Sequence, residues 1–289
     1  MIVRVIPRLD IKGPNLVKGV HLEGLRVLGK PERFARFYYE QGADELLFMD
    51  VVASLYGRNS LLEIIERTSR EVFVPLGVGG GIRTIEDIRA VLRAGADKVA
   101  INTAAVRRPD FIREAARRFG SSTIVISLEV IHRSDGTWEA YTDNGREKTG
   151  LEALQWAVRA AELGAGELLV TAVHREGTGR GYDLELTRRI AQAVSIPVIA
   201  CGGVGSVSHV AAAVVEGMAD AVCLASMLHY NFVKNHALEG DFDPSIDLAH
   251  LHHAKGFGEI EDVGLADLKA RLDEQHIQSR PPDRISVDA

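Results

Sequence analysis

Two carboxylates, Asp10 and Glu129, each come directly after an apolar run of the kind that forms a buried strand. Asp10 follows Val-Ile-Pro-Arg-Leu and Glu129 follows Ile-Val-Ile-Ser-Leu. Two carboxyl groups divide acid and base roles when their surroundings separate their pKa values, and each role typically accelerates a reaction about 10²–10⁴-fold. We expect both at the mouth of a barrel. The alternative is that they cap turns or pair with Lys12 and Lys18.

Two glycine turns have the sequence of phosphate sites. Val78-Gly-Gly-Gly-Ile82 and Cys201-Gly-Gly-Val204 each follow an expected strand and precede an expected helix. Glycine lets backbone N–H groups approach an anion closely, whereas a single such triplet is often only a turn. The residues expected to bind phosphate or substrate are Gly80, Gly81, Asn102 and Thr103 in the first site, Gly202, Gly203, Ala225 and Ser226 in the second, and Gly177, Thr178, Lys18, Asp50 and Thr171 around them. For Asp50 and Thr171 a structural role is equally compatible with the sequence. The sequence predicts an elongated ligand with a phosphate at each end.

Four charged residues of alternating sign precede or begin expected strands: Arg4, Glu45, Lys98 and Glu167. The starts of parallel strands meet at the N-terminal face of a barrel. A ring of two cations and two carboxylates there closes the barrel floor as an ion-paired gate, or simply stabilises it. Spacing alone favours the stabilising layer.

The elements that position these residues alternate between short apolar segments and longer amphipathic ones, which is typical of parallel strands covered by helices. The expected strands are Val3–Leu9, Glu45–Asp50, Phe73–Val78, Lys98–Ile101, Thr123–Leu128, Glu167–Ala172, Pro197–Ala200 and Ala221–Ala225. The expected helices are Pro31–Gln41, Ser60–Thr68, Thr84–Ala94, Pro109–Phe119, Gly150–Leu163, Asp183–Ala193, Ser206–Glu216 and Ile260–Gln275. Eight such pairs predict an α/β protein with a (β/α)8 TIM barrel, a fold of about 250 residues.

The chain repeats itself at a spacing of about 122 residues. Gln41-Gly-Ala-Asp-Glu-Leu-Leu47 is echoed by Leu163-Gly-Ala-Gly-Glu-Leu-Leu169, and Gly80-Gly81-Ile82 by Gly202-Gly203-Val204. Asp97 aligns approximately with Asp220, and Asp10 with Glu129. The repeat predicts two similar half-barrels about an approximate twofold axis.

Composition and the C-terminal region limit the possible roles. A net charge of −6 argues against nucleic acid as a partner, and the apolar runs are too short for a membrane span. We expect a single barrel over residues 1–278, an insertion at about 230–259 that begins as a loop at His229, and a disordered tail over 279–289. Neither a metal nor a cofactor is expected, because the histidines at 229, 236, 250, 252 and 253 lack metal-ligand spacing. Cys201 and Cys223 have no evident cationic partner and form no CxxC pair, which favours core packing in a reducing cytoplasm.

These motifs together resemble the cyclase subunit of imidazole glycerol phosphate synthase, from histidine biosynthesis. The resemblance runs from Arg4 to about His229 and resumes around Glu259 to Gln275. It depends on Leu9-Asp-Ile-Lys12, Leu16-Val-Lys-Gly19, Asp44-Glu-Leu-Leu-Phe-Met-Asp50, Val78-Gly-Gly-Gly-Ile82, Ile101-Asn-Thr-Ala-Ala-Val106 and Arg175-Glu-Gly-Thr178.

The resemblance implies a lyase whose separate glutaminase subunit docks at the N-terminal face and supplies ammonia through the barrel. The acceptor would be a bis-phosphorylated ribulosyl aminoimidazole carboxamide nucleotide, and the products imidazole glycerol phosphate and an aminoimidazole carboxamide ribotide. Asp10 would be one catalytic carboxyl. The ammonia gate would be formed by Arg4, Glu45, Lys98 and Glu167. Spacing alone had instead favoured a stabilising layer.

The sequence also departs from the family pattern. Glu129 and Glu176 stand where Asp is usual, and Arg8 stands where a small residue or Cys is usual. The extra methylene of Glu129 matters because a misplacement of about 1 Å at a reacting centre can cost about 10²-fold in rate. Two alternatives therefore remain open. One is a paralogue that passes ammonia to another phosphorylated acceptor, such as a nucleotide-linked sugar; the other is a non-catalytic docking barrel for a glutaminase.

Overall fold

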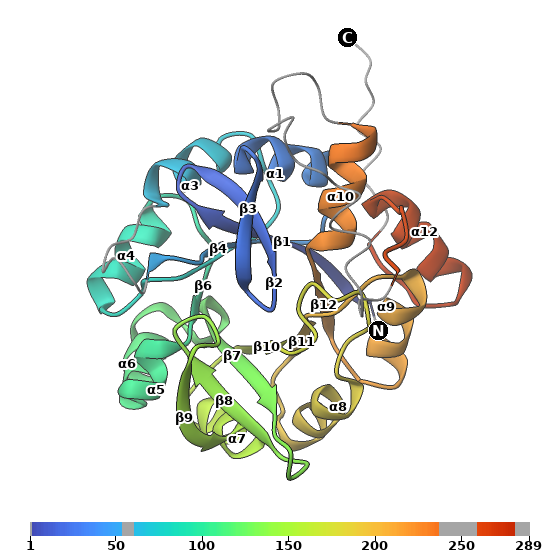
Figure 1. The fold of residues 1–289 in the computed structure, drawn as a ribbon. Coiled ribbons are helices and arrows are strands. Elements are labelled where there is room, and N and C mark those ends of the chain that lie inside the picture. Colours follow the sequence, from blue (N-terminus) through green and yellow to red (C-terminus); the bar gives the residue numbers. More distant parts are fainter. Residues whose placement is uncertain (1, 54–60, 237–258, 281–289) are drawn as a thin grey trace.

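A closed ring of parallel strands forms the centre of the molecule (Figure 1). The computed structural model describes residues 2–53, 61–236 and 259–280. Within those residues eight parallel strands follow the order β10-β11-β12-β1-β4-β5-β6-β7, and β7 pairs with β10 to close the ring. They are β1 (Arg4–Lys12), β4 (Leu46–Asp50), β5 (Leu76–Gly79), β6 (Lys98–Ile101), β7 (Ile124–His132), β10 (Glu167–Ala172), β11 (Val198–Cys201) and β12 (Ala221–Leu224). The predicted (β/α)8 barrel is confirmed.

Helices surround the strands and cover their outer face (Figure 1). They are α1 (Pro31–Glu40), α3 (Leu62–Thr68), α4 (Ile85–Arg93), α5 (Thr103–Arg107), α6 (Asp110–Phe119), the short 3-10 turn η1 (Ser121–Thr123), α7 (Ala153–Glu162), α8 (Leu184–Ala193), α9 (Val207–Val215), α10 (Ser226–Asn235) and α12 (Leu265–Glu274). In the described part of the chain, no helix is both long and apolar enough to cross a bilayer.

Two β-hairpins that were not predicted from the sequence rise over the barrel mouth. β2 (Asn15–Val20) and β3 (Glu23–Gly29) continue from β1, while β8 (Trp138–Thr142) and β9 (Glu147–Glu152) continue from β7. Figure 1 shows them on opposite sides of the mouth. Since β1 and β7 run beyond their expected ends into these hairpins, Asp10 and Glu129 lie within strands. The helix expected from Gly150 therefore begins only at Ala153.

The barrel has an outer and an inner core because neighbouring residues of a strand point to opposite faces. On β4, Leu46 and Phe48 belong to the layer between strands and helices, and Leu47 and Met49 belong to the barrel interior. Both faces of each barrel strand are thus buried, which explains the continuous apolar runs in the sequence.

Equivalent aspartates support the same turn in each half of the barrel. Asp97 accepts a 2.8 Å hydrogen bond from the backbone N–H of Leu76, and Asp220 accepts a 2.8 Å bond from that of Val198. Each aspartate thus fixes the start of the preceding strand. This shared geometry, together with the paired hairpins, confirms the predicted half-barrel repeat.

The prediction of a loop that begins at His229 is wrong for residues 229–235, which are helical. Residues up to Asn235 extend α10, because its apolar side chains pack on α1: the Phe232 and Phe34 rings are 4.3 Å apart between centroids. Residues 237–258, with three of the histidines weighed as metal ligands, lie outside the described residues. So does most of the tail predicted over 279–289, although Ser279 forms a β-bridge with Val3.

Candidate active site

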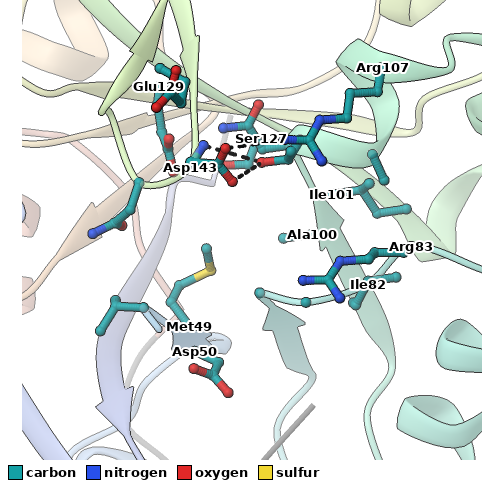
Figure 2. Close-up of a pocket in the computed structure, with 18 of the residues that line it drawn as sticks. Met49, Asp50, Ile82, Arg83, Ala100, Ile101, Arg107, Ser127, Glu129 and Asp143 are labelled. Atoms are coloured by element: carbon teal, nitrogen blue, oxygen red, sulfur yellow. Dashed lines mark hydrogen bonds and ion pairs between the residues drawn. The ribbon is translucent and has the colours of Figure 1, made fainter. Parts of the chain in front are cut away.

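A cavity of about 880 Å³ opens at the barrel mouth, above the carboxyl ends of β4 to β7 (Figure 2). Its lining combines the first glycine turn, four carboxylates and four arginines: Asp50, Gly80, Gly81, Asn102, Thr103, Glu129, Asp143, Glu147, Arg83, Arg107, Arg108 and Arg146. Cations around backbone N–H groups favour an anionic ligand. The carboxylates add proton-transfer groups to the same space.

Glu129 lies at the edge of this pocket and has the electrostatics of a proton-transfer group. Its side chain is buried on β7, and its Oε2 accepts a 2.7 Å hydrogen bond from the backbone N–H of Gly145 in the β8–β9 turn. Burial raises its pKa to about 7, against the opposing effects of that hydrogen bond and of Arg8. A carboxyl that titrates near neutral pH can both release and accept a proton under physiological conditions.

This raised pKa predicts a pH-dependent loss of stability. The folded chain keeps a proton on Glu129 up to about pH 7, whereas the unfolded chain releases it near the ordinary value of 4.5. Stability therefore falls as pH rises between these values. As the pH rises from below 4.5 to above 7, the unfolding free energy of the wild type should fall by up to about 3 kcal/mol more than that of Glu129→Gln, at about 1.4 kcal/mol per pKa unit. Urea unfolding of both proteins at about pH 5 and about pH 7.5 measures this difference, and parallel pH curves would contradict it.

Asp10 is buried beside the pocket and is not among its lining residues. Its Oδ1 accepts a 2.7 Å bond from Arg8 Nε, and Lys18 Nζ lies 3.9 Å from its Oδ2. Lys18 also forms an ion pair with Glu176, and all four side chains are at most 5% exposed. Burial opposes the charge of Lys18, yet the facing carboxylates raise its pKa above the ordinary value. The structure therefore places Asp10 and Lys18 in one buried ion network.

Thr171 also lies in this network and not in the pocket. Its hydroxyl accepts from Arg8 Nη1 at 3.4 Å, and it is fully buried. Arg8 further contacts Cys201 Sγ at 3.5 Å, so the expectation that no cation lies beside the cysteines is wrong. A hydrogen bond with Cys223 lowers the pKa of Cys201, burial opposes this, and Arg8 adds to the lowering. Sequence spacing did not reveal this contact because it joins β1 to β11 across the barrel.

The first glycine turn is open to the pocket. Gly80 and Gly81 have φ values of 96° and 71°, a region that favours glycine. A Cβ on Gly80 would lie 2.3 Å from the carbonyl oxygen of Asp50, so no larger residue fits. The amide of Asn102 donates to Tyr141 O at 3.1 Å, and the hydroxyl of Thr103 accepts from the backbone N–H of Asp143 at 3.2 Å. Both side chains thus lie at the pocket but also hold the β8–β9 hairpin.

The second glycine turn encloses a much smaller space. Gly202 and Gly203 have φ values of 95° and 103°. The residues expected there surround a cavity of about 10 Å³, lined among others by Gly177, Gly202, Gly203, Ala225 and Ser226. Thr178 is not among its lining residues, and its hydroxyl donates to the carbonyl of Arg175 at 2.6 Å. The two glycine sites are thus equivalent in backbone and unequal in open volume.

The four charged residues at the strand starts form a closed ring of ion pairs. Arg4 Nη1 lies 2.9 Å from Glu45 Oε2 and 3.0 Å from Glu167 Oε1, and Lys98 Nζ lies 2.8 Å and 3.1 Å from the same two carboxylates. Burial raises the pKa of Glu45 above its ordinary value, although Lys98 opposes the rise. Above this ring lies an apolar cavity of about 10 Å³, close to the minimum that holds one water-sized molecule.

Three features of the site were missed in the sequence. The first is the set of contacts made by Arg8: the sequence placed an unusual cation near the mouth but did not indicate that it contacts Asp10, Thr171 and Cys201. The second is His229, which is fully buried: its Nδ1 accepts from the Tyr38 hydroxyl at 2.6 Å, and its Nε2 donates to the carbonyl of Arg8 at 2.9 Å. Burial lowers the pKa of His229 to about 3, so it stays neutral. The third is the arginine group of the pocket. The adjacent arginines Arg107 and Arg108, which closely follow Asn102 and Thr103, could have indicated it.

The chain is similar to known proteins of one family. The family described as "Histidine biosynthesis protein" matches residues 4–234. "Imidazole glycerol phosphate synthase subunit HisF" of Legionella pneumophila is 58% identical over 207 residues, which cover 72% of this chain and 98% of that protein. The protein of the same name from Alkaliphilus metalliredigens (strain QYMF) is 53% identical over 230 residues, 80% of this chain and 91% of that protein. The chain therefore belongs to the family of imidazole glycerol phosphate synthase subunit HisF.

Proposed function

We propose that this chain is the ammonia-using cyclase of imidazole glycerol phosphate synthesis, a carbon–nitrogen lyase. Its acceptor would be the bis-phosphorylated ribulosyl aminoimidazole carboxamide nucleotide, and its products imidazole glycerol phosphate and the aminoimidazole carboxamide ribotide. The observation that carries the proposal is the placement of Glu129, with a pKa raised to about 7, in the same pocket as the glycine turn at Gly80 and Gly81. The names of the two relatives support it.

In this proposal Glu129 transfers protons at the reacting centre. Protons must move when ammonia adds to the acceptor and when the ribotide leaves, and a buried carboxyl titrating near neutral pH suits both steps. Asp10, held by Arg8, would be the second carboxylate of the pair. The two glycine turns would bind the terminal phosphates, with Asn102 and Thr103 beside the first and Ala225 and Ser226 beside the second. Asp50 would line the mouth between them.

The N-terminal face would receive the partner. We propose that a glutaminase subunit docks there and that ammonia enters through the ring of Arg4, Glu45, Lys98 and Glu167. The apolar cavity directly above the ring supports this route, because an apolar, water-sized space suits neutral ammonia. Ammonia would then reach the mouth without passing through solvent.

Steady-state turnover with free ammonium and the imidazole precursor tests the proposal. Turnover is expected in the absence of any glutaminase, together with stimulation of the glutaminase when the two chains are mixed with precursor. Precursor binding without turnover would reject the cyclase. Glutaminase activation without an imidazole product would instead support a different phosphorylated acceptor or a docking barrel. The ion pair between Arg8 and Asp10 is the specific observation that favours a different acceptor, because it engages one of the two expected catalytic carboxyls.

The second glycine turn gives a prediction about binding. A Cβ on Gly203 would lie 2.2 Å from the carbonyl oxygen of Gly181, at a φ of 103°. Gly203→Ala should therefore displace the backbone N–H groups of this turn and raise KM for the precursor at least about tenfold, because a phosphate contact is lost. Gly136→Ala is the matched control, since Gly136 also has positive φ (83°) but no atom within 4 Å of an added Cβ. Equal KM values for the two variants would exclude a phosphate at Gly203.

A further inference from the structure

Arg8 closes one side of the barrel interior. The small cavity above the charged ring is lined on this side by Ile6 of β1, Leu169 of β10 and Ile199 of β11. Arg8, Thr171 and Cys201 lie two residues further along the same three strands, so they form the next interior layer toward the mouth. Arg8 Nη1 contacts Thr171 at 3.4 Å and Cys201 at 3.5 Å, which joins this layer across the interior.

Arg8 is held in this position from two directions. Its Nε donates to Asp10 at 2.7 Å, and its backbone carbonyl accepts from His229 Nε2 at 2.9 Å. The Arg8 side chain is 3% exposed. A long side chain with these contacts fills the space above the cavity on the side of β1, β10 and β11.

The opposite side of the interior combines small residues with Leu47, Met49 and Val125. Ala100 lines both the inner cavity and the large mouth pocket, so only a thin wall separates the two at this point. Gly77 and Gly79 on the neighbouring strand contribute no side chain, and the side chains of Leu47 and Met49 pack against them. Met49 and Ser127 belong to the mouth pocket on this side (Figure 2), and Glu129 follows Ser127 on the same face of β7.

We propose that Arg8 makes the exit of the ammonia channel one-sided: ammonia leaves the inner cavity past Ala100, between Met49 and Ser127, and arrives beneath Glu129. This rests on the proposed use of ammonia. The exit on the side of Asp10 is closed by the Arg8 guanidinium, whose positive charge also disfavours ammonium in the interior. The two carboxylates are then unequal: Glu129 lies on the route of the incoming nitrogen, and Asp10 lies on the closed side, paired with Arg8.

A blocking variant and its suppressor test this route in the complete enzyme with the glutaminase. Ala100→Val adds two methyl groups at the shared wall and should lower glutamine-driven turnover at least tenfold relative to ammonium-driven turnover. Adding Arg8→Ser should restore that ratio to within about threefold of wild type, because it opens the second side. The ratio cancels any effect of the substitutions on the chemistry itself, including the loss of the partner of Asp10. Thermal unfolding of each variant confirms that it is folded.

An unchanged ratio in Ala100→Val would overturn the exit past Ala100, and failure of Arg8→Ser to restore it would overturn the closure by Arg8. A second measurement needs neither acceptor nor glutaminase. In a Cys201→Ser background Cys223 is the remaining cysteine of the chain, and it lines both the inner cavity and the small cavity at the second glycine turn. Arg8→Ser should accelerate its reaction with methyl methanethiosulfonate at least tenfold, with Lys12→Ser as the exposed control on the same strand. Equal rates would reject the closure even if the enzyme uses a different acceptor.

Discussion

Replacing Glu129 with Gln is expected to lower kcat with free ammonium by about 10³-fold, within the range of general acid–base catalysis. Gln keeps the length of the side chain and an oxygen that can accept from the Gly145 N–H, but it cannot transfer a proton. KM should change little, because the glycine turns that would bind the phosphates are untouched. The measurement is steady-state turnover of the purified chain with the imidazole precursor and saturating ammonium.

The matched control is Glu129→Asp, which keeps the acid and shortens the side chain by one methylene. Since the 2.7 Å contact with Gly145 is then lost, we expect an intermediate loss of about 10-fold to 10²-fold. The wild-type pH profile should show a limb near pH 7, where the pKa of Glu129 lies, and this limb should be missing from the residual activity of Glu129→Gln. Full activity in Glu129→Gln would show that this carboxyl transfers no proton in the reaction.

Replacing Lys18 with Met is expected to have the largest effect on stability, a loss of about 3–5 kcal/mol of unfolding free energy. Lys18 forms a buried ion pair with Glu176 and lies 3.9 Å from Asp10. Met fills a similar volume but leaves Glu176 as a buried carboxylate without its ammonium partner. Urea unfolding at neutral pH measures the loss.

Two further variants separate the buried charge from simple packing. Lys18→Met with Glu176→Gln removes both charges and should recover most of the loss, because replacing a whole buried pair is far less costly than breaking it. Arg159→Met breaks an exposed pair with Glu162, both partners being more than half exposed, and should cost less than about 0.5 kcal/mol. If Lys18→Met costs no more than Arg159→Met, the buried network does not stabilise the fold.

Much of the barrel was predictable from local patterns. Apolar runs such as Leu46 to Met49 identified the parallel strands, because a strand buried on both faces must be apolar throughout. The repeat identified the two halves, and residues such as Asp97 and Asp220 have the same role in both. The hairpins were missed because their strands are partly exposed, as in β3 and β9, and lack a clear alternation of apolar and polar residues.

The candidate site was predicted in its position and only partly in its contacts. Gly80 and Asn102 line the expected mouth pocket because each follows a parallel strand, and Glu129 lines it from β7, where it pairs with Thr171 near the end of β10. Asp10 and Thr171 were expected at the same mouth, but both accept hydrogen bonds from Arg8 and do not line the pocket. No pattern along the chain indicates that a side chain on β1 reaches β10, since these strands are separated by more than 150 residues.

The sequence by itself determined the barrel, its twofold repeat, the two glycine turns and the strands that carry the carboxylates, because each depends on neighbouring residues and their spacing. The tertiary structure decided which carboxylate faces the pocket and which is engaged by an arginine. It also set the pKa of Glu129, since burial and hydrogen bonding depend on atoms brought together from distant parts of the chain.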